Sequence, residues 1–170
     1  KHINLTYESS FRYLNVWLDK DKMDSILKNI ISNALKYTPD GGNVHVFTSE
    51  TEDTWSIEVK DTGIGIPASE QKKLFKMHFR GSNAINSKVT GSGIGLLLVG
   101  KLVHLHKGKL NFSSMEGKGS CIKITFPKGN KHFRKAIQRP QPQNERIVYS
   151  ASGVPINAST TTSPSSSGIY

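Results

Sequence analysis

The stretch KNIISNALKYTPDGG, residues 28–42, is the end of an amphipathic helix with one anomaly. Apolar residues before and within it recur at the 3–4 spacing of a buried stripe, which predicts a helix over about residues 22–37 that TPDGG ends. Asn29 and Asn33 lie well inside this helix, although Asn is a mediocre helix former because its amide competes for backbone groups. A local rule broken without a local gain often marks a functional site.

Strand and helix signals on both sides of this helix predict one domain. Residues 43–50 and 54–61 alternate as two strands around a short turn. Antiparallel-looking strands and helices, without regular β-α-β alternation, predict an α+β two-layer sandwich with a mixed sheet. Within residues 1–18 we expect one or two short strands, on the basis of the apolar alternation at Phe11, Tyr13, Leu14, Val16 and Leu18. Asp19 or Asp21 is expected to cap the first helix. Further helices are expected at 68–79 and at 96–106, the latter ended by Gly108, and further strands at 108–116 and 120–127.

Composition divides the chain after Pro127. We expect a folded domain at residues 1–128 and a polar linker or tail at 129–170, where RPQPQNE and NASTTTSPSSSG cannot bury enough apolar area to fold alone. Between them, IVYSASGVPI could lie extended on a surface. Residues 80–95 are polar and glycine-rich without hydrophobic periodicity, so we expect a loop there.

Composition and charge also exclude several classes of function. A single cysteine, Cys121, rules out an internal disulfide and a multi-cysteine metal site. The sequence contains no run of about 18 apolar residues, which is the length that a membrane-spanning helix needs. The net charge is +10. Residues 1–127 hold 17 Lys and Arg against 12 Asp and Glu and so account for half of this charge, and the tail carries the other half. Basic and aromatic residues are not interleaved, so we expect no direct nucleic-acid partner and no membrane contact.

Three polar side chains of the first helix fall on one strip beside its apolar face. At about 100° per residue, Asn29, Asn33 and Lys36 lie close together. Amide oxygens one turn apart can share a hard cation such as Mg²⁺, and a lysine one turn further on can reach a phosphate. A solvated helix face would show the same pattern, so the strip alone leaves both interpretations open.

Two glycine-rich motifs follow. DTGIGI, residues 61–66, ends a strand, so that Asp61 offers a carboxylate where glycines admit a ligand to the backbone. GSGIGL, residues 91–96, opens the second long helix, whose free N–H groups favour an anion. GSGIGL is neither a P-loop, which needs G-x-x-x-x-G-K-[ST], nor a Rossmann loop, which follows a strand directly. DTGIGI could instead be a tight turn with a solvated Asp, and GSGIGL could be a flexible linker that leads into the helix.

In this order the motifs resemble the ATP-binding catalytic domain of sensor histidine kinases, of the GHKL class with the Bergerat fold. NIISNALKYTP resembles the N box, DTGIGI and GSGIGL the two glycine boxes, LFKMHFR the phenylalanine box, and GKGS the last motif. Together they span residues 19–127. The phenylalanine box departs from the family pattern at Met77 and His78, which weakens the match of Phe75 and Phe79.

The resemblance implies a site for ATP and Mg²⁺. Asn33 is the expected metal ligand, and Asn29 supports the metal and its waters. Lys36 and Arg80 would meet phosphates and, with Asn29, are the expected catalytic residues. Asp61 would accept a hydrogen bond from the adenine amino group. The other expected nucleotide contacts are Tyr37, Gly63, Gly65, Ile66, Gly91, Gly93, Gly95, Leu96 and Ser120, and residues 81–90 would form a mobile ATP lid.

The resemblance also implies partners. The family's acceptor is a His followed by an acidic residue and an apolar-proline stretch, a context that none of the six histidines has. His104 and His106 are instead expected on the surface near a helix end. We therefore expect a fragment that passes the γ-phosphoryl of ATP to a histidine on a separate dimerisation/acceptor domain, with a response-regulator receiver domain as a further partner. The expected location is cytoplasmic, within an inner-membrane sensor. The tail resembles the stretch that joins a kinase core to a receiver domain in hybrid sensors.

Three other functions stay open. An ATP-driven clamp like the gyrase, mismatch-repair and heat-shock relatives would need a transducer domain, whereas a linker follows here. At the position that matches Asn29, those ATPases carry a glutamate, which activates the attacking water. A nucleotide-binding module without catalysis would keep the same motifs, because intact motifs indicate binding more than turnover. A serine kinase of the anti-sigma type shares the fold.

Overall fold

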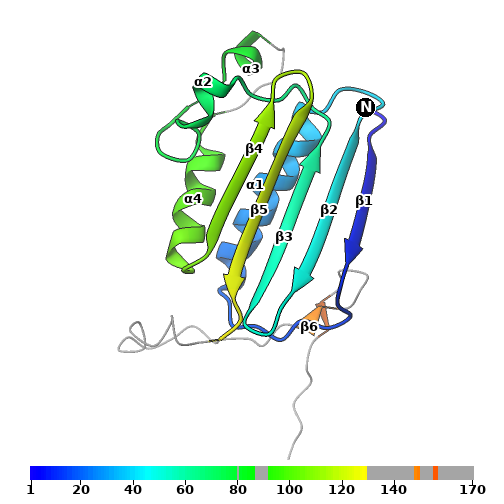
Figure 1. The fold of residues 1–170 in the computed structure, drawn as a ribbon, viewed down its shortest axis with the longest axis vertical. Helices are drawn as coiled ribbons and strands as arrows, with labels where there is room; N and C mark the ends of the chain where they lie inside the picture. Colours follow the sequence, from blue (N-terminus) through cyan, green and yellow to red (C-terminus); the bar gives the residue numbers. More distant parts are fainter. Residues whose placement is uncertain (80, 87–91, 130–147, 150–154, 157–170) are drawn as a thin grey trace, which may run out of the picture.

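A five-stranded mixed sheet forms the base of the fold (Figure 1). The computed structural model describes residues 1–79, 81–86, 92–129, 148–149 and 155–156. The strands are β1 (Asn4–Ser9), β2 (Asn43–Glu50), β3 (Thr54–Asp61), β4 (Lys109–Met115) and β5 (Gly119–Pro127), and they lie in the order β1-β2-β3-β5-β4. β1 runs parallel to β2, and the other neighbouring strands of this sheet are antiparallel. The predicted α+β sandwich is confirmed.

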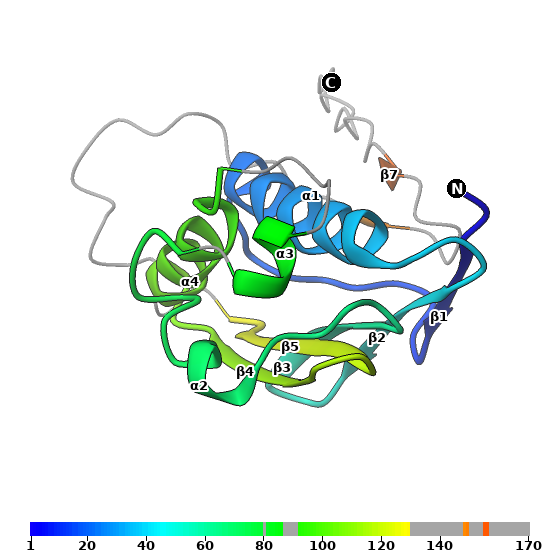
Figure 2. The ribbon, with the colours of Figure 1, turned by 90° about the horizontal axis from the view of Figure 1, so that it is seen from above.

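The two long helices pack on one face of this sheet (Figure 2). The two long helices, α1 (Lys20–Tyr37) and α4 (Gly95–Leu105), lie side by side over it, and the short helices α2 (Ala68–Gln71) and α3 (Ser82–Asn86) lie near one end. Asp19 caps α1, since its side chain accepts a hydrogen bond from the Lys22 backbone N–H at 3.1 Å. This bond satisfies one of the N–H groups that a helix start leaves open.

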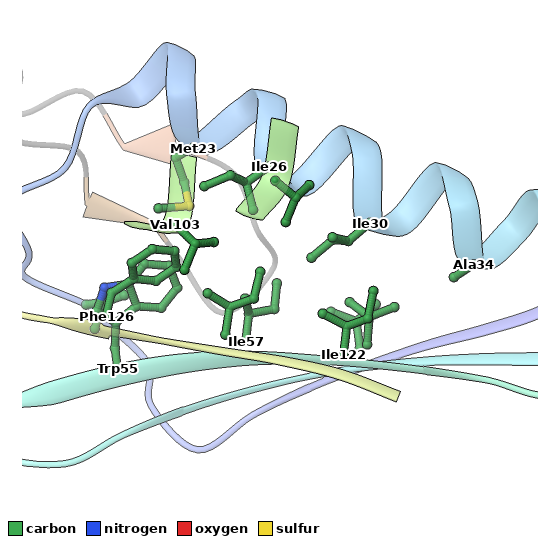
Figure 3. Close-up of a cluster of buried hydrophobic side chains, with 14 of the residues drawn as sticks. Met23, Ile26, Ile30, Ala34, Trp55, Ile57, Val103, Ile122 and Phe126 are labelled. Carbon is green, nitrogen blue, oxygen red and sulfur yellow. The ribbon is translucent and has the colours of Figure 1, made fainter. Parts of the chain in front are cut away.

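The apolar stripe of α1 fixes the height of that helix above the sheet (Figure 3). Ile26 and Ile30 are fully buried, and Trp55 of β3 stacks on Phe126 of β5 with ring centroids 5.1 Å apart. Burying one such side chain contributes about 1.5–3 kcal/mol. Because the stripe is locked against β3 and β5, the polar strip next to it is held at a fixed place. The labelled core residues are Met23, Ile26, Ile30, Ala34, Trp55, Ile57, Val103, Ile122 and Phe126.

The apolar alternation of residues 11–18 does not form a strand. β1 ends at Ser9, before that alternation begins, and residues 10–18 are irregular. Leu14 and Val16 are nevertheless buried in the core, while Tyr13 and Trp17 are exposed. The alternation therefore reflects a segment that packs against the core without pairing to the sheet, so this basis for the strand prediction was wrong.

The helix predicted at residues 68–79 is much shorter. α2 stops at Gln71, and the chain continues in turns whose backbone hydrogen bonds join residues three apart, from Lys73 to Glu70 and from Leu74 to Gln71. These turns bury Leu74, which is 4% exposed. The loop predicted at 80–95 also needs correction, because the described residues there include the five-residue helix α3.

The end of α4 differs from the prediction in two ways. Lys107, not Gly108, takes the left-handed conformation, with φ of 54°. The Lys107 N–H donates to the His104 carbonyl and the Gly108 N–H to the Val103 carbonyl, which is the Schellman arrangement with the glycine one position late. His106 is buried rather than on the surface, with its ring edge against Phe126, whereas His104 is exposed as expected.

In the tail, the structure describes two short paired strands, β6 (Val148–Tyr149) and β7 (Pro155–Ile156). They lie within the segment expected to be extended. The boundary between domain and tail near residue 128 stays a prediction. Within the described part of the chain, no helix has the length and apolar character needed to cross a membrane.

Candidate functional site

A cavity of about 400 Å³ lies between α1, the turn after β3 and the start of α4. Gly63 is not on its wall but directly beside Asp61, to whose Oδ1 its N–H donates at 2.8 Å. Arg80 and Gly91 lie outside the described residues. The expected site residues that the structure brings together on the wall are Asn29, Asn33, Lys36, Tyr37, Asp61, Gly65, Ile66, Gly93, Gly95, Leu96 and Ser120.

The Asn29 side chain connects α1 to the start of α4. Its Nδ2 donates to the Ser25 carbonyl one turn earlier at 2.7 Å, which fixes the orientation of the amide. Its Oδ1 then faces Gly95, where a Cβ would lie only 2.5 Å from that oxygen. Glycine at the first position of α4 therefore allows the amide oxygen to reach the helix start.

Asn33, one turn further along α1, is available for a ligand. Its side chain lines the cavity and makes no hydrogen bond with the described residues. No cluster of three or more His, Cys, Asp or Glu that could hold a metal occurs among the described residues. A cation here would thus depend on amide oxygens together with waters and ligand oxygens. That donor set suits Mg²⁺, which prefers oxygen and keeps several waters.

Lys36 is the third member of the strip, and Tyr37 follows it at the end of α1. The Lys36 ammonium lies 5.2 Å from the centroid of the Tyr37 ring. The Tyr37 carbonyl accepts the Ile64 N–H at 3.2 Å, so the end of α1 is attached to the turn after β3. A positive charge and an aromatic ring therefore border the same cavity.

Asp61 is a half-buried carboxylate at the end of β3. Its Oδ1 accepts from the Gly63 N–H at 2.8 Å and from the Ser120 N–H at 3.2 Å. Burial raises the pKa of Asp61 above its ordinary value, although these two hydrogen bonds oppose the shift. The other carboxylate oxygen receives no hydrogen bond from the described residues, so it remains an acceptor for whatever enters the cavity.

The turn that follows Asp61 depends on Gly65. This residue has φ of 62°, a conformation that side chains disfavour. A Cβ there would lie 1.9 Å from the Met115 carbonyl oxygen, so the turn packs directly on the β4–β5 hairpin. The close approach explains the glycine without reference to a ligand, while it also brings Ile66 to the cavity wall.

The start of α4 borders one end of the cavity. Gly93, Gly95 and Leu96 border it, and the residue that precedes the helix, Ile94, supplies no side-chain cap. The N–H groups of a first helical turn lack partners within the helix and lie at the positive end of its dipole. An anion can take the place of the missing cap.

A family model described as "Histidine kinase-, DNA gyrase B-, and HSP90-like ATPase" matches residues 18–130. The chain belongs to this family. The sensor histidine kinase WalK of Bacillus subtilis is 40% identical over 129 residues, which are 75% of this chain and 21% of WalK. The circadian input-output histidine kinase CikA of Thermosynechococcus vestitus is 40% identical over 111 residues, which are 65% of this chain and 15% of CikA. The chain thus spans about a fifth of these relatives or less.

Solved structures agree with this assignment. The mycobacterial sensor histidine kinase MprB superposes with a TM-score of 0.65 at 28% identity, over 74% of this chain and 83% of that one. The catalytic domain of histidine kinase ThkA shares the fold, with a TM-score of 0.65 at 24% identity over 76% and 82% of the two chains. The described domain is therefore a histidine kinase ATP-binding catalytic domain, and ATP is its nucleotide.

Sequence reasoning about this histidine kinase domain missed Asn83 of α3. Its Nδ2 donates to the Gly65 carbonyl at 2.9 Å, while the Ser82 N–H donates to Glu70 at 3.0 Å. These bonds attach α3 to the turn after β3 and to α2. Neither bond has a local sequence signal, because each joins residues at least 12 positions apart.

The apolar wall was only partly anticipated. The strand and helix patterns mark its members as core residues, but periodicity does not show which core residues border a cavity. Phe79 lines the cavity, whereas Phe75 packs edge-on against Phe112, with centroids 5.5 Å apart. The wall residues not predicted as site residues are Ile30, Ser32, Ala34, Val59, Ile64, Leu74, Phe79, Gly81, Asn83, Ala84, Ser92, Phe112 and Ile122.

Proposed function

We propose that this domain binds Mg·ATP and passes the γ-phosphoryl to a histidine on a separate dimerisation/acceptor domain, from which a receiver domain takes it. One observation carries the proposal: a single cavity joins a carboxylate acceptor at one end to an amide strip, a lysine and an uncapped helix start at the other. The first end suits an adenine and the second a magnesium triphosphate.

The proposed roles follow the wall of the cavity. Asp61 accepts from the adenine amino group, and Tyr37 lies along the nucleotide. Asn33, with Asn29 beside it, holds Mg²⁺, which neutralises triphosphate charge when it is bound. Lys36 meets a phosphate. Ile66 and Gly65 shape the base pocket, where Ser120 also lies, and Gly63 holds Asp61 in place beside it. Gly93, Gly95 and Leu96 form the phosphate end. Arg80 and Gly91, which lie outside the described residues, would add phosphate contacts.

The composition of the wall supports a histidine rather than water as the nucleophile. Among the described wall residues Asp61 is the one carboxylate, and there is no histidine. The amide of Asn29 cannot accept a proton near neutral pH, so no described wall residue at the phosphate end can act as a base for water. A neutral imidazole already carries a lone pair and needs no such base.

We further propose that residues 1–128 form this domain and that residues 129–170 link it to another part of the protein. Since the nucleotide is cytoplasmic, we place the domain on the cytoplasmic side of a membrane-anchored sensor. We propose no nucleic acid and no lipid among the contacts of the domain.

The isolated chain should bind Mg·ATP yet hydrolyse it at less than about one turnover per minute, as in nucleotide enzymes whose catalytic site is incomplete. It should also not phosphorylate itself. Calorimetry measures the binding, and phosphate release measures the hydrolysis. Asn33→Ala, purified in the same way, is the control. Hydrolysis that this variant abolishes belongs to the chain, and hydrolysis that it leaves unchanged belongs to a contaminant.

Three outcomes would contradict this expectation. Rapid hydrolysis that Asn33→Ala abolishes would favour an ATP-driven conformational module. Acid-stable label on the chain or on a substrate protein would favour a serine kinase. Absence of nucleotide binding by a folded chain would remove the proposal altogether.

A further inference from the structure

Ser114 of β4 connects three parts of the base pocket although it does not line the cavity. Its Oγ accepts the Ile66 N–H at 2.8 Å and donates to the Gly119 carbonyl at 2.9 Å. The same Oγ lies 3.0 Å from the hydroxyl oxygen of Ser120, which is on the wall. One hydroxyl therefore meets the turn after β3, the hairpin and a residue of the pocket.

These contacts determine which way the Ser120 hydroxyl donates. A serine hydroxyl has one proton and two lone pairs. A carbonyl cannot donate, so the Ser114 proton goes to Gly119, and the Ile66 N–H occupies one lone pair of Ser114. The contact between the two serines can then form only if Ser120 donates its proton to Ser114. The lone pairs of Ser120 are left for the cavity.

Ser120 lies beside Asp61. The two residues are paired in register across β3 and β5, and the Ser120 N–H donates to Oδ1 of Asp61 at 3.2 Å. Both line the cavity. With Ser120 oriented as above, both residues offer acceptors to this end of the cavity and neither offers a hydroxyl donor. Such an end accepts an amino group and opposes a carbonyl.

The position of Ser114 does not depend on a ligand. The Gln71 side-chain amide donates to the Ser114 carbonyl at 2.8 Å and to the Ile66 carbonyl at 2.9 Å. Both of its protons are used, so the backbone of Ser114 and that of the turn are held together. The orientation of Ser120 is thus set before the nucleotide arrives.

We propose that Ser114 is a positioning residue for base selection, which holds the Ser120 hydroxyl as an acceptor and so favours a 6-amino purine over a 6-oxo purine. The inference rests on the proposed function in one respect, namely that this end of the cavity receives the nucleobase. Without Ser114 the Ser120 hydroxyl is free to rotate and to donate to a carbonyl, which removes part of the discrimination.

The test compares ADP with IDP, which carries a carbonyl in place of the adenine amino group. In Ser114→Ala, ADP affinity should fall and IDP affinity should rise or hold, so that their ratio drops about fivefold to tenfold, the size of one hydrogen bond exchanged. Calorimetry on the full chain gives both affinities. Ser113→Ala is the matched control, because Ser113 is the neighbouring serine of β4, is exposed and lies off the cavity wall.

Further variants separate positioning from mere support. Ser114→Thr keeps the hydroxyl and should restore the ratio to within about twofold of the native chain. Ser120→Ala removes the lone pairs and should lower the ratio even if Ser114→Ala fails to fold. Equal weakening of ADP and IDP in Ser114→Ala, or an unchanged ratio in Ser120→Ala, would overturn the inference. A native chain that binds neither nucleotide would instead overturn the proposed function.

Discussion

Asn33→Ala should lower phosphoryl transfer by on the order of a hundredfold or more while leaving ADP affinity within about threefold. The side chain lines the cavity with no hydrogen bond to the described residues, so its removal breaks no contact of the fold. What it removes is an oxygen ligand for the metal, and a triphosphate without its metal is poorly neutralised and poorly aligned. Transfer to a supplied acceptor domain and ADP calorimetry measure the two quantities.

The matched control for Asn33→Ala is Asn111→Ala. Asn111 is an exposed residue of β4 away from the cavity, so the same chemical change there should leave both quantities unaltered. Chelating magnesium should bring native transfer down to the level of Asn33→Ala. If Asn33→Ala supported normal transfer with a normal magnesium requirement, Asn33 would not be the metal ligand.

Asp61→Asn should weaken ATP binding by at least about 2 kcal/mol. Asn can still accept the N–H groups of Gly63 and Ser120 through its Oδ1, so the turn and the hairpin keep their bonds. The second oxygen becomes an amide donor that faces the donor of the adenine amino group. Calorimetry with ATP and GTP measures the effect, and Asp53→Asn in the exposed β2–β3 turn is the control.

The stability of Asp61→Asn should not fall at neutral pH. A carboxylate whose folded-state pKa is raised favours folding at low pH and loses that contribution as the pH rises through the folded-state value. Burial raises the pKa of Asp61, so its ionised form costs stability at neutral pH, and Asn avoids this cost. Unchanged ATP affinity in a folded Asp61→Asn variant would contradict the adenine assignment.

The parts of the fold that sequence predicts are those with a repeating local pattern. The stripe of α1, the cap at Asp19 and the strands β2, β3 and β5 follow from periodicity and turn chemistry. The errors fall where tertiary packing decides. Leu14 and Val16 are buried without forming a strand, and Lys107 takes a conformation for which glycine is the usual choice.

The site divides in the same way. The strip on α1 lies within one short stretch of sequence, and the turn after Asp61 lies within another. Within each stretch, the side chains could be predicted to act together. The bond between Asn83 and Gly65 joins residues 18 positions apart, and the bond between Ile66 and Ser114 joins residues 48 positions apart. No local pattern predicts such partners, because they depend on how the β4–β5 hairpin and α3 pack on the turn after β3.

The most direct test of the account is transfer from γ-labelled ATP to the cognate dimerisation/acceptor domain. With magnesium present, the chain should place label on that domain as phosphohistidine, which is labile to acid and stable to base. The label should vanish when the acceptor histidine of that domain is replaced and when this chain carries Asn33→Ala. An unlabelled acceptor domain, with both proteins folded and ATP bound, or label that survives acid, would contradict the account.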